Sequence, residues 1–240
     1  MALILHIDTS TATGSVCLAE NRKYLASLSS TEQKDHASVI PVFIRRLMEE
    51  NHISGRDVDA VAISAGPGSY TGLRVAASTA KGLCYAWDKP LIAVSTLQMM
   101  AAGLKENMSP PASAYWLCPM IDARRDEVFT ALYNEELQEE EAPHALVVSS
   151  DAFSSRLDER LVFFFGDGSK KFQTLTSHPA ARFPAYLPDA CHLIGLAADA
   201  FEKKRFADLA YFEPFYVKPF YSTSPAKPSN RLAKLNYDRL

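Results

Sequence analysis

The stretch from Val58 to Trp87, VDAVAISAGPGSYTGLRVAASTAKGLCYAW, decides the fold class of this chain. Its first part, residues 58–64, is mostly apolar, which is typical of a strand buried on both faces. The loop from Gly66 to Gly72 contains three glycines, and glycine allows backbone conformations and close approaches that other residues resist. Residues 73–87 then predict a helix rich in small side chains. A buried strand that passes through a glycine loop into a helix indicates an α/β protein.

The segments on either side of this stretch predict the rest of one lobe. Apolar and alternating runs upstream predict three strands and a helix, and the residues downstream predict one more strand and one more helix. The order of three strands, helix, strand, helix is that of one half of the actin-like, ribonuclease H-like (ASKHA) fold. The predicted strands are 3–8, 15–19, 24–28 and 91–94, and the predicted helices are 38–51 and 95–104.

A polar break with two adjacent prolines, residues 105–113, separates this lobe from a less regular second half. A strand hairpin is predicted after the break, followed by an acidic loop at residues 135–141. An amphipathic helix at residues 193–203 is predicted to pack back on the first lobe. The predicted organisation is a first actin-like lobe at 1–104, a reduced second lobe at 105–217 and a loose tail at 218–240.

The composition excludes several classes of function. The 240 residues carry a net charge of −3, with 48% hydrophobic and 22% charged residues. This is the balance of an ordinary soluble globular protein, and it argues against a protein that binds nucleic acid alone, which needs a strongly basic surface. The four cysteines lie far apart, without the close pairs of metal or redox motifs. With no basic leader and no apolar run of membrane-span length, we expect a cytoplasmic protein that makes no membrane contact.

The first candidate for binding chemistry is the sequence IDTSTATGSV at residues 7–16. Asp8 ends a buried strand, where a carboxylate can orient a hydrated Mg²⁺. The hydroxyls of Thr9, Ser10 and Thr11, with the amides of the turn, can meet phosphate oxygens. The same residues also form ordinary turns through bonds from side chain to backbone. On the residues alone both interpretations stay open.

The glycine loop is the second candidate. Gly66, Gly68 and Ser69 precede a helix whose N-terminus favours an anion, and Ser69 or Thr71 can cap that helix. The loop lacks the Gly-Lys-Ser/Thr ending of a P-loop and the spacing of a dinucleotide fingerprint. A tight connection from strand to helix, without any ligand, is the alternative.

Two helices carry more apolar and small side chains than one sheet face would cover, and such a surplus predicts a protein interface. Small side chains let another helix approach closely, whether it belongs to a partner or to the same chain. A crossover helix packed within the chain is the alternative. The predicted interface residues are Val39, Phe43, Leu73, Ala76, Ala77, Ala80 and Leu83.

Four segments together resemble the TsaB/YeaZ family. They are ILHIDTST at residue 4, GPGSYTGLRVAASTAKGL at 66, PLIAVSTLQMMA at 90 and IDARRDEVF at 121. The resemblance implies a two-lobed actin-like fold and a role as the non-catalytic partner of TsaD in threonylcarbamoylation of adenosine in tRNA. It also implies a TsaE-type accessory ATPase as a further partner, a homodimer when the protein is alone, and contact with tRNA only through the complex.

The sequence departs from the catalytic paralogue at its metal site. In TsaD-like proteins two histidines, four residues apart on a helix, hold a metal, and that spacing places both on one helix face. Aligned on the strand at 91–94, this sequence has Thr96 and Met100 at those positions, and threonine is a poor ligand. We therefore predict no metal site and no catalytic residue. No cofactor is expected to be required, and weak binding of ATP or ADP with Mg²⁺ is left open.

Two enzymatic functions are the alternatives. Asp8 and the glycine loop would suit an ATP-binding actin-like enzyme, either a carbamoyl transferase or a kinase. The peptidase activity once attached to this superfamily is the last alternative, and it would need a ligand pair for zinc that the sequence lacks.

Overall fold

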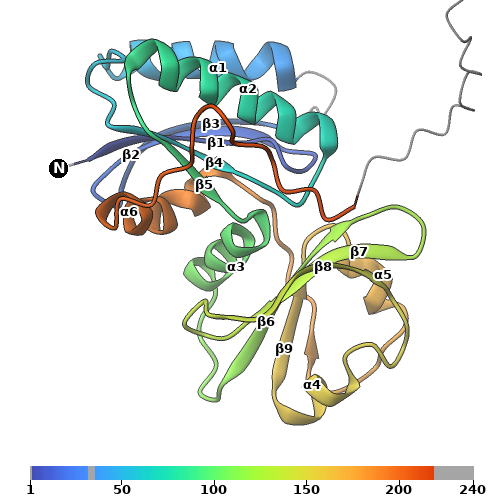
Figure 1. Cartoon of the computed structure of the whole chain (residues 1–240). Helices are drawn as coiled ribbons and strands as arrows, with labels where there is room; N and C mark the ends of the chain where they lie inside the picture. The colour runs from blue at the N-terminus through green and yellow to red at the C-terminus, as the bar shows by residue number, and fades with distance from the viewer. Residues whose placement is uncertain (1, 32–35, 219–240) are drawn as a thin grey trace, which may run out of the picture.

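The computed structural model describes residues 2–31 and 36–218. Within these residues the chain forms two five-stranded sheets, each with helices packed against it (Figure 1). The first sheet has the strand order β3-β2-β1-β4-β5, and the second has the order β10-β9-β6-β7-β8.

The first sheet follows the predicted order of elements. Its strands are β1 (Leu3–Asp8), β2 (Gly14–Glu20), β3 (Lys23–Ser30), β4 (Ala60–Ser64) and β5 (Leu91–Val94). The first three strands pair antiparallel, whereas β4 runs parallel to both β1 and β5. The helices α1 (His36–Glu50), α2 (Tyr70–Trp87) and α3 (Thr96–Asn107) complete this part. The prediction of a two-lobed, actin-like α/β fold is confirmed.

The second sheet consists of β6 (Tyr115–Asp122), β7 (Glu127–Tyr133), β8 (Glu139–Val147), β9 (Leu161–Phe165) and β10 (Ala181–Arg182). Two short helices, α4 (Ser154–Glu159) and α5 (Ser169–Gln173), accompany it. The predicted acidic loop at residues 135–141 is wrong in its second half, because residues 139–141 belong to β8. That strand lies at the edge of the sheet, where charged side chains reach water and discourage pairing with another chain.

Helices cover both faces of the first sheet. Figure 1 shows α1 and α2 side by side over one face, with α6 (Ile194–Glu202) against the other. Between the two sheets lies α3, which contacts β6 and β7 of the second sheet. Its buried residues share one hydrophobic cluster with both sheets. The predicted lobe boundary at residue 104 therefore falls within a helix that packs against both lobes.

After the second sheet the chain returns to the first. A short 3-10 helix, η2 (Ala190–Leu193), leads into α6, which contacts β5 and β1. Further along, Ala207 donates a backbone hydrogen bond to Leu91 of β5. Of the predicted tail at 218–240, Lys218 pairs with Glu127, and residues 219–240 lie outside the described residues. In the part of the chain that the structure describes, no helix is both long and apolar enough to cross a membrane.

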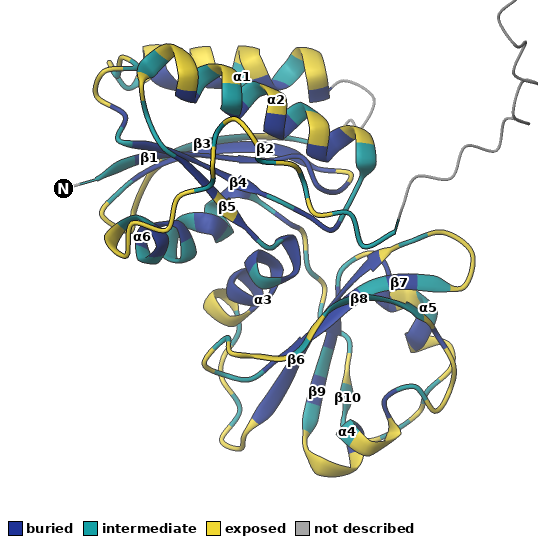
Figure 2. Cartoon of the chain, in the orientation of Figure 1, coloured by how far each residue is buried: buried dark blue, intermediate teal, exposed yellow. Residues whose placement is uncertain are grey.

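The predicted partner surface is wrong for four of its seven residues. In Figure 2 the sides of α1 and α2 that face the sheet are buried, and their outer sides are exposed. The spacing of residues 73, 76, 77 and 80 puts them on one face of α2, and that face packs on the sheet. Their small size is used inside the chain, since it lets α2 approach β4 closely. The residues in question are Leu73, Ala76, Ala77 and Ala80, whereas Val39, Phe43 and Leu83 are partly exposed.

A pair of substitutions on α2 tests this assignment of its faces. Ala76→Arg should destabilise the protein by more than about 4 kcal/mol, because it forces an unpaired charge into a fully buried position. Ser78→Arg, two residues away on the exposed face, should change stability by less than about 0.5 kcal/mol. Urea unfolding followed by circular dichroism measures both values. Equal stability of the two variants would contradict the assignment.

Candidate functional site

Asp8, at the end of β1, is completely buried. One of its carboxylate oxygens, Oδ1, accepts hydrogen bonds from the backbone N–H of Ser10 at 3.0 Å, from the Ser10 hydroxyl at 2.6 Å and from the Ser64 hydroxyl. The other oxygen, Oδ2, has no hydrogen-bond partner among the described residues. Burial raises the pKa of this carboxyl above its usual range, because a carboxylate loses its hydration there. Asp8 therefore acts inside the β1–β2 turn and is not presented to solvent.

The glycine loop lies directly against this turn. The backbone N–H of Ser69 donates to the carbonyl of Ser10 at 2.7 Å, and the Thr9 hydroxyl donates to the carbonyl of Gly72 at 2.6 Å. A Cβ atom on Gly68 would lie 2.3 Å from the Ser10 oxygen, and one on Gly72 would lie 1.8 Å from the Thr9 oxygen. Only glycine permits such an approach. The fold thus brings the two predicted phosphate loops together, but they bind each other.

The N-terminus of α2 is also occupied by groups of the chain itself. Ser69 caps the helix, since its hydroxyl accepts a hydrogen bond from the Gly72 N–H at 3.3 Å. The ring of Tyr216 lies 5.0 Å from that of Tyr70, and the Arg74 guanidinium lies 4.1 Å from the Tyr70 ring centroid. The C-terminal segment therefore packs against side chains of the first turns of the helix.

Thr96 and Met100, the residues at the paralogue's metal positions, take part in packing. The Thr96 hydroxyl accepts a hydrogen bond from the Gly66 N–H at 3.0 Å, and its own N–H donates to the Gly66 carbonyl at 2.9 Å. Met100 is buried, and its methyl group would lie 2.6 Å from a Cβ on Gly166. Over residues 2–31 and 36–218, no three His, Cys, Asp or Glu side chains gather into a group able to hold a metal ion.

A cavity of about 420 Å³ lies between the lobes. Of the seven predicted loop residues, Thr11 alone lines it, and its neighbours Ala12 and Thr13 complete that wall. The opposite wall comes from the second half of the chain and includes Asp167 and Lys170. This cavity is where a ligand could reach both lobes, although the carboxylate of Asp8 does not line it.

A cluster beside this cavity was not predicted from the sequence. The Tyr186 hydroxyl lies 2.9 Å from Nδ1 of His192, and Asp189 caps η2. The Ala190 N–H donates to the Ser15 hydroxyl at 2.8 Å, which ties η2 to β2. Burial is the main cause of a lowered His192 pKa, so its imidazole is neutral at pH 7. The sequence shows these residues only singly, without a motif, so no signal in it could have grouped them.

Comparisons with known proteins show the family to which this chain belongs. Residues 27–213 match the family model described as TsaD: tRNA N6-adenosine threonylcarbamoyltransferase. The protein of Bacillus subtilis called tRNA threonylcarbamoyladenosine biosynthesis protein TsaB is 30% identical over 166 residues, which cover 68% of this chain and 70% of the relative. The chain belongs to the TsaB/YeaZ family. This confirms the resemblance on which the expected function was based.

Further members of the TsaB/YeaZ family match over almost the whole chain. The Haemophilus influenzae protein of the same name is 28% identical over 224 residues, covering 90% of this chain and 93% of the relative. A crystal structure from *Pseudomonas aeruginosa*, of a protein described as similar to peptidase YEAZ, superposes with a TM-score of 0.79 at 28% identity. It covers 91% of this chain and 100% of that chain. Both lobes are therefore shared with the family.

The buried carboxyl predicts a specific dependence of stability on pH. Because folding raises the pKa of Asp8, the native state holds its proton more tightly than the unfolded state does. This contribution to stability is present below the ordinary pKa of 3.8 and is lost as the pH rises through the folded value. The free energy of unfolding of Asp8→Asn should therefore rise relative to that of the wild type from pH 4 towards neutral pH. Urea unfolding across that range measures the difference.

Asp57→Asn provides a control of opposite sign. Hydrogen bonds from Ser54 lower the pKa of Asp57, so its contribution is present above the ordinary pKa and is lost as the pH falls. Asp57→Asn should therefore have a lower free energy of unfolding than the wild type at neutral pH, and this difference should shrink as the pH falls. A difference between Asp8→Asn and the wild type that stays constant with pH would show that burial does not raise the Asp8 pKa.

Proposed function

We propose that this chain is the non-catalytic partner of a TsaD-type protein in forming threonylcarbamoyladenosine on tRNA. Membership of a family named for this biosynthesis gives the pathway. The contact between the glycine loop and the β1–β2 turn supports the non-catalytic role. It uses the hydroxyl of Thr9 and the amide of Ser69 within the chain, so these groups do not face a substrate.

The exposed sides of α1 and α2 form the proposed docking face. Gly82 lies inside an 18-residue helix, and a Cβ there would meet no atom within 4 Å. A glycine inside a helix costs about 1 kcal/mol relative to alanine, and no contact with the described residues 2–31 and 36–218 explains this one. Ser78, Gly82 and Ala86 are all exposed at four-residue spacing, which lets a second helix approach closely. Tyr85, on the same helix and three residues after Gly82, is 84% exposed, and Val42 on α1 is 47% exposed.

In this proposal the docking face also forms the homodimer, whereas the accessory ATPase and tRNA bind the complex. A homodimer of the isolated chain would use it and would compete with the TsaD-type partner. We further propose that the complex, in the cytoplasm, recruits a TsaE-type accessory ATPase and provides the contacts with tRNA. The net charge of −3 agrees with tRNA contact through a partner, since phosphate binding requires a basic surface.

Substitutions on this face test the proposal. Gly82→Arg should weaken binding to the TsaD-type partner at least about tenfold, because the new side chain separates the helices and loses hydration at the interface. Threonylcarbamoyladenosine formed on tRNA by the reconstituted complex should fall in parallel. Val147→Arg is the matched control, because Val147 is an exposed apolar residue on β8, in the other lobe. Unchanged binding and activity of Gly82→Arg, at intact stability, would refute the docking face.

An ATP-binding actin-like enzyme is the second candidate function. The cavity between the lobes favours it, because Thr11 and Thr13 line one wall and Lys170 lies on the other. Against it, Asp8 is buried with its oxygen Oδ1 already bonded to Ser10 and Ser64. A carboxylate that orients Mg²⁺ has to reach the ion or its water shell.

Nucleotide binding by the isolated chain separates the two functions. Because Asp8 is buried away from the cavity and the glycine loop is bonded to the β1–β2 turn, we expect calorimetry with ATP and Mg²⁺ to show a dissociation constant weaker than about 1 mM and no hydrolysis. Lys170→Ala should leave this result unchanged. Micromolar binding accompanied by turnover, and lost in Lys170→Ala, would establish the enzyme and overturn the non-catalytic assignment.

A further inference from the structure

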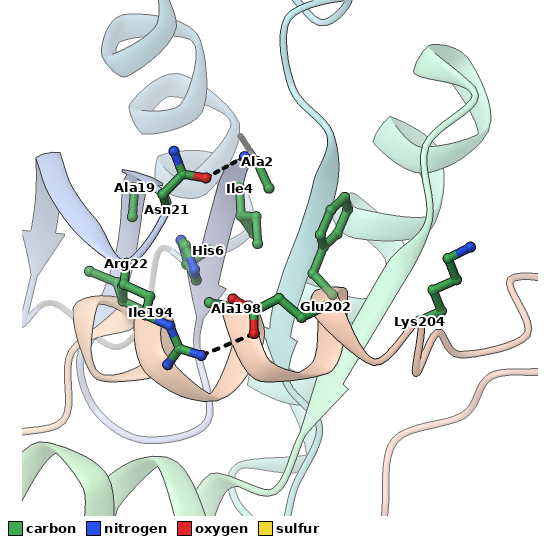
Figure 3. A pocket seen from close by; sticks show the side chains of 11 residues that line it. Ala2, Ile4, His6, Ala19, Asn21, Arg22, Ile194, Ala198, Glu202 and Lys204 are labelled. Carbon is green, nitrogen blue, oxygen red and sulfur yellow. Dashed lines mark hydrogen bonds and ion pairs between the residues drawn. The ribbon is translucent and has the colours of Figure 1, made fainter.

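A second cavity, of about 380 Å³, lies on the side of the first sheet that faces away from α1 and α2. Figure 3 shows it between β1, the β2–β3 turn and α6. Its volume falls in the range of small-molecule sites. The residues that line it are Ala2, Ile4, His6, Ala19, Asn21, Arg22, Ile194, Ala198, Phe201, Glu202 and Lys204.

Small side chains on opposite walls leave this space open. Ile4 of β1 pairs with Ala19 of β2, so both side chains lie on the same face of the sheet, and α6 contributes Ala198 opposite them. Longer side chains at either alanine would fill the gap, as interiors normally are filled. The facing parts of β1, β2 and α6 are therefore apolar and allow an apolar body to enter, whereas Asn21, Arg22, Glu202 and Lys204 add polar groups to the lining.

The β2–β3 turn closes one side of the cavity. Asn21 and Arg22 both have left-handed backbone conformations, with φ of 46° and 69°. The Arg22 guanidinium pairs with Asp199 and, at 3.4 Å, with Glu202, both on α6. These pairs are about half exposed and add little stability, but they neutralise the arginine at the rim.

The floor of the cavity carries an unpaired polar atom. His6 is 1% exposed, and its Nδ1 lies 3.3 Å from the carbonyl oxygen of Cys17. A carbonyl oxygen only accepts, so Nδ1 carries the proton, and Nε2 offers a lone pair. Burial lowers the His6 pKa to about 4, so the ring is neutral at pH 7. Nε2 has no hydrogen-bond partner among residues 2–31 and 36–218, and leaving a buried acceptor unsatisfied destabilises the fold.

We propose that this cavity binds a small, uncharged, largely apolar molecule that donates one O–H or N–H hydrogen bond to Nε2 of His6. A carboxylate or phosphate does not fit, since both it and Nε2 are acceptors. The rim also gives no net charge for an ion, because Arg22 and Lys204 are balanced by Asp199 and Glu202. The site lies across the sheet from the docking face, so it stands independently of the proposed function.

Phenol is the probe, because it joins an apolar ring to one hydroxyl donor, and anisole is its counterpart without the donor. The full chain, with ¹⁵N-labelled histidine, is titrated with each compound and followed by NMR at the His6 ring. Phenol should shift the Nε2 resonance saturably, and anisole should bind at least fivefold more weakly. Absence of a saturable shift with phenol, or equal binding of anisole, would overturn the proposal.

Two variants locate the binding. Ala198→Leu fills the cavity from α6 and should abolish the phenol shift, whereas Ala142→Leu, the same change at an exposed position of β8, should leave it unchanged. His6→Phe should remove the preference for phenol over anisole, as measured by thermal stabilisation. Should His6→Phe fail to fold, Ala198→Leu still decides, because phenol binding that survives in that variant places the ligand elsewhere and refutes the site.

Discussion

The close contact between the glycine loop and the β1–β2 turn is the constraint on which the rest of the structure depends. With 1.8 Å between the Thr9 oxygen and a Cβ placed on Gly72, no residue larger than glycine fits there. Since α2 begins within this loop, the contact fixes where the helix starts and which face it turns to the sheet. Thr96 holds the other side of the loop through two hydrogen bonds to Gly66, which fixes the start of α3 as well.

The two lobes are held together by packing around α3. A Cβ on Gly103 would lie 2.3 Å from the His192 ring, so this glycine lets η2 lie directly on the helix. One turn earlier, Met100 meets Gly166 of the second lobe in the same manner. The hydrophobic cluster around α3 draws residues from both sheets. Contacts of this density set the angle between the lobes without a bound ligand, because packed interiors resist deformation.

The sequence predicted the first lobe well, because its strands are apolar runs and its glycine loop marks the turn into α2. It marked the β1–β2 turn and the glycine loop as separate candidates for phosphate binding, but not that the two would contact each other, since such a contact joins residues about 60 positions apart in the sequence. The small residues Ala76 and Ala80 were misassigned for a related reason, because small size suits an internal face and a partner surface equally. Residues 139–141 were predicted as loop because charge there outweighed the pattern of an edge strand. His6 and Tyr186 carried no local signal at all.

The return of the chain to its first sheet has a consequence for synthesis on the ribosome. The face of the first sheet that carries Ile4 and His6 is covered by α6, whose residues 194–202 follow the whole second sheet. Until those residues emerge, α6 cannot cover that face in the nascent chain, and all residues of the second sheet are synthesised in the meantime. Contacts between parts so distant in sequence slow folding and leave apolar surface open to aggregation or chaperones. The N-terminal lobe is therefore the first to be started and among the last to be finished.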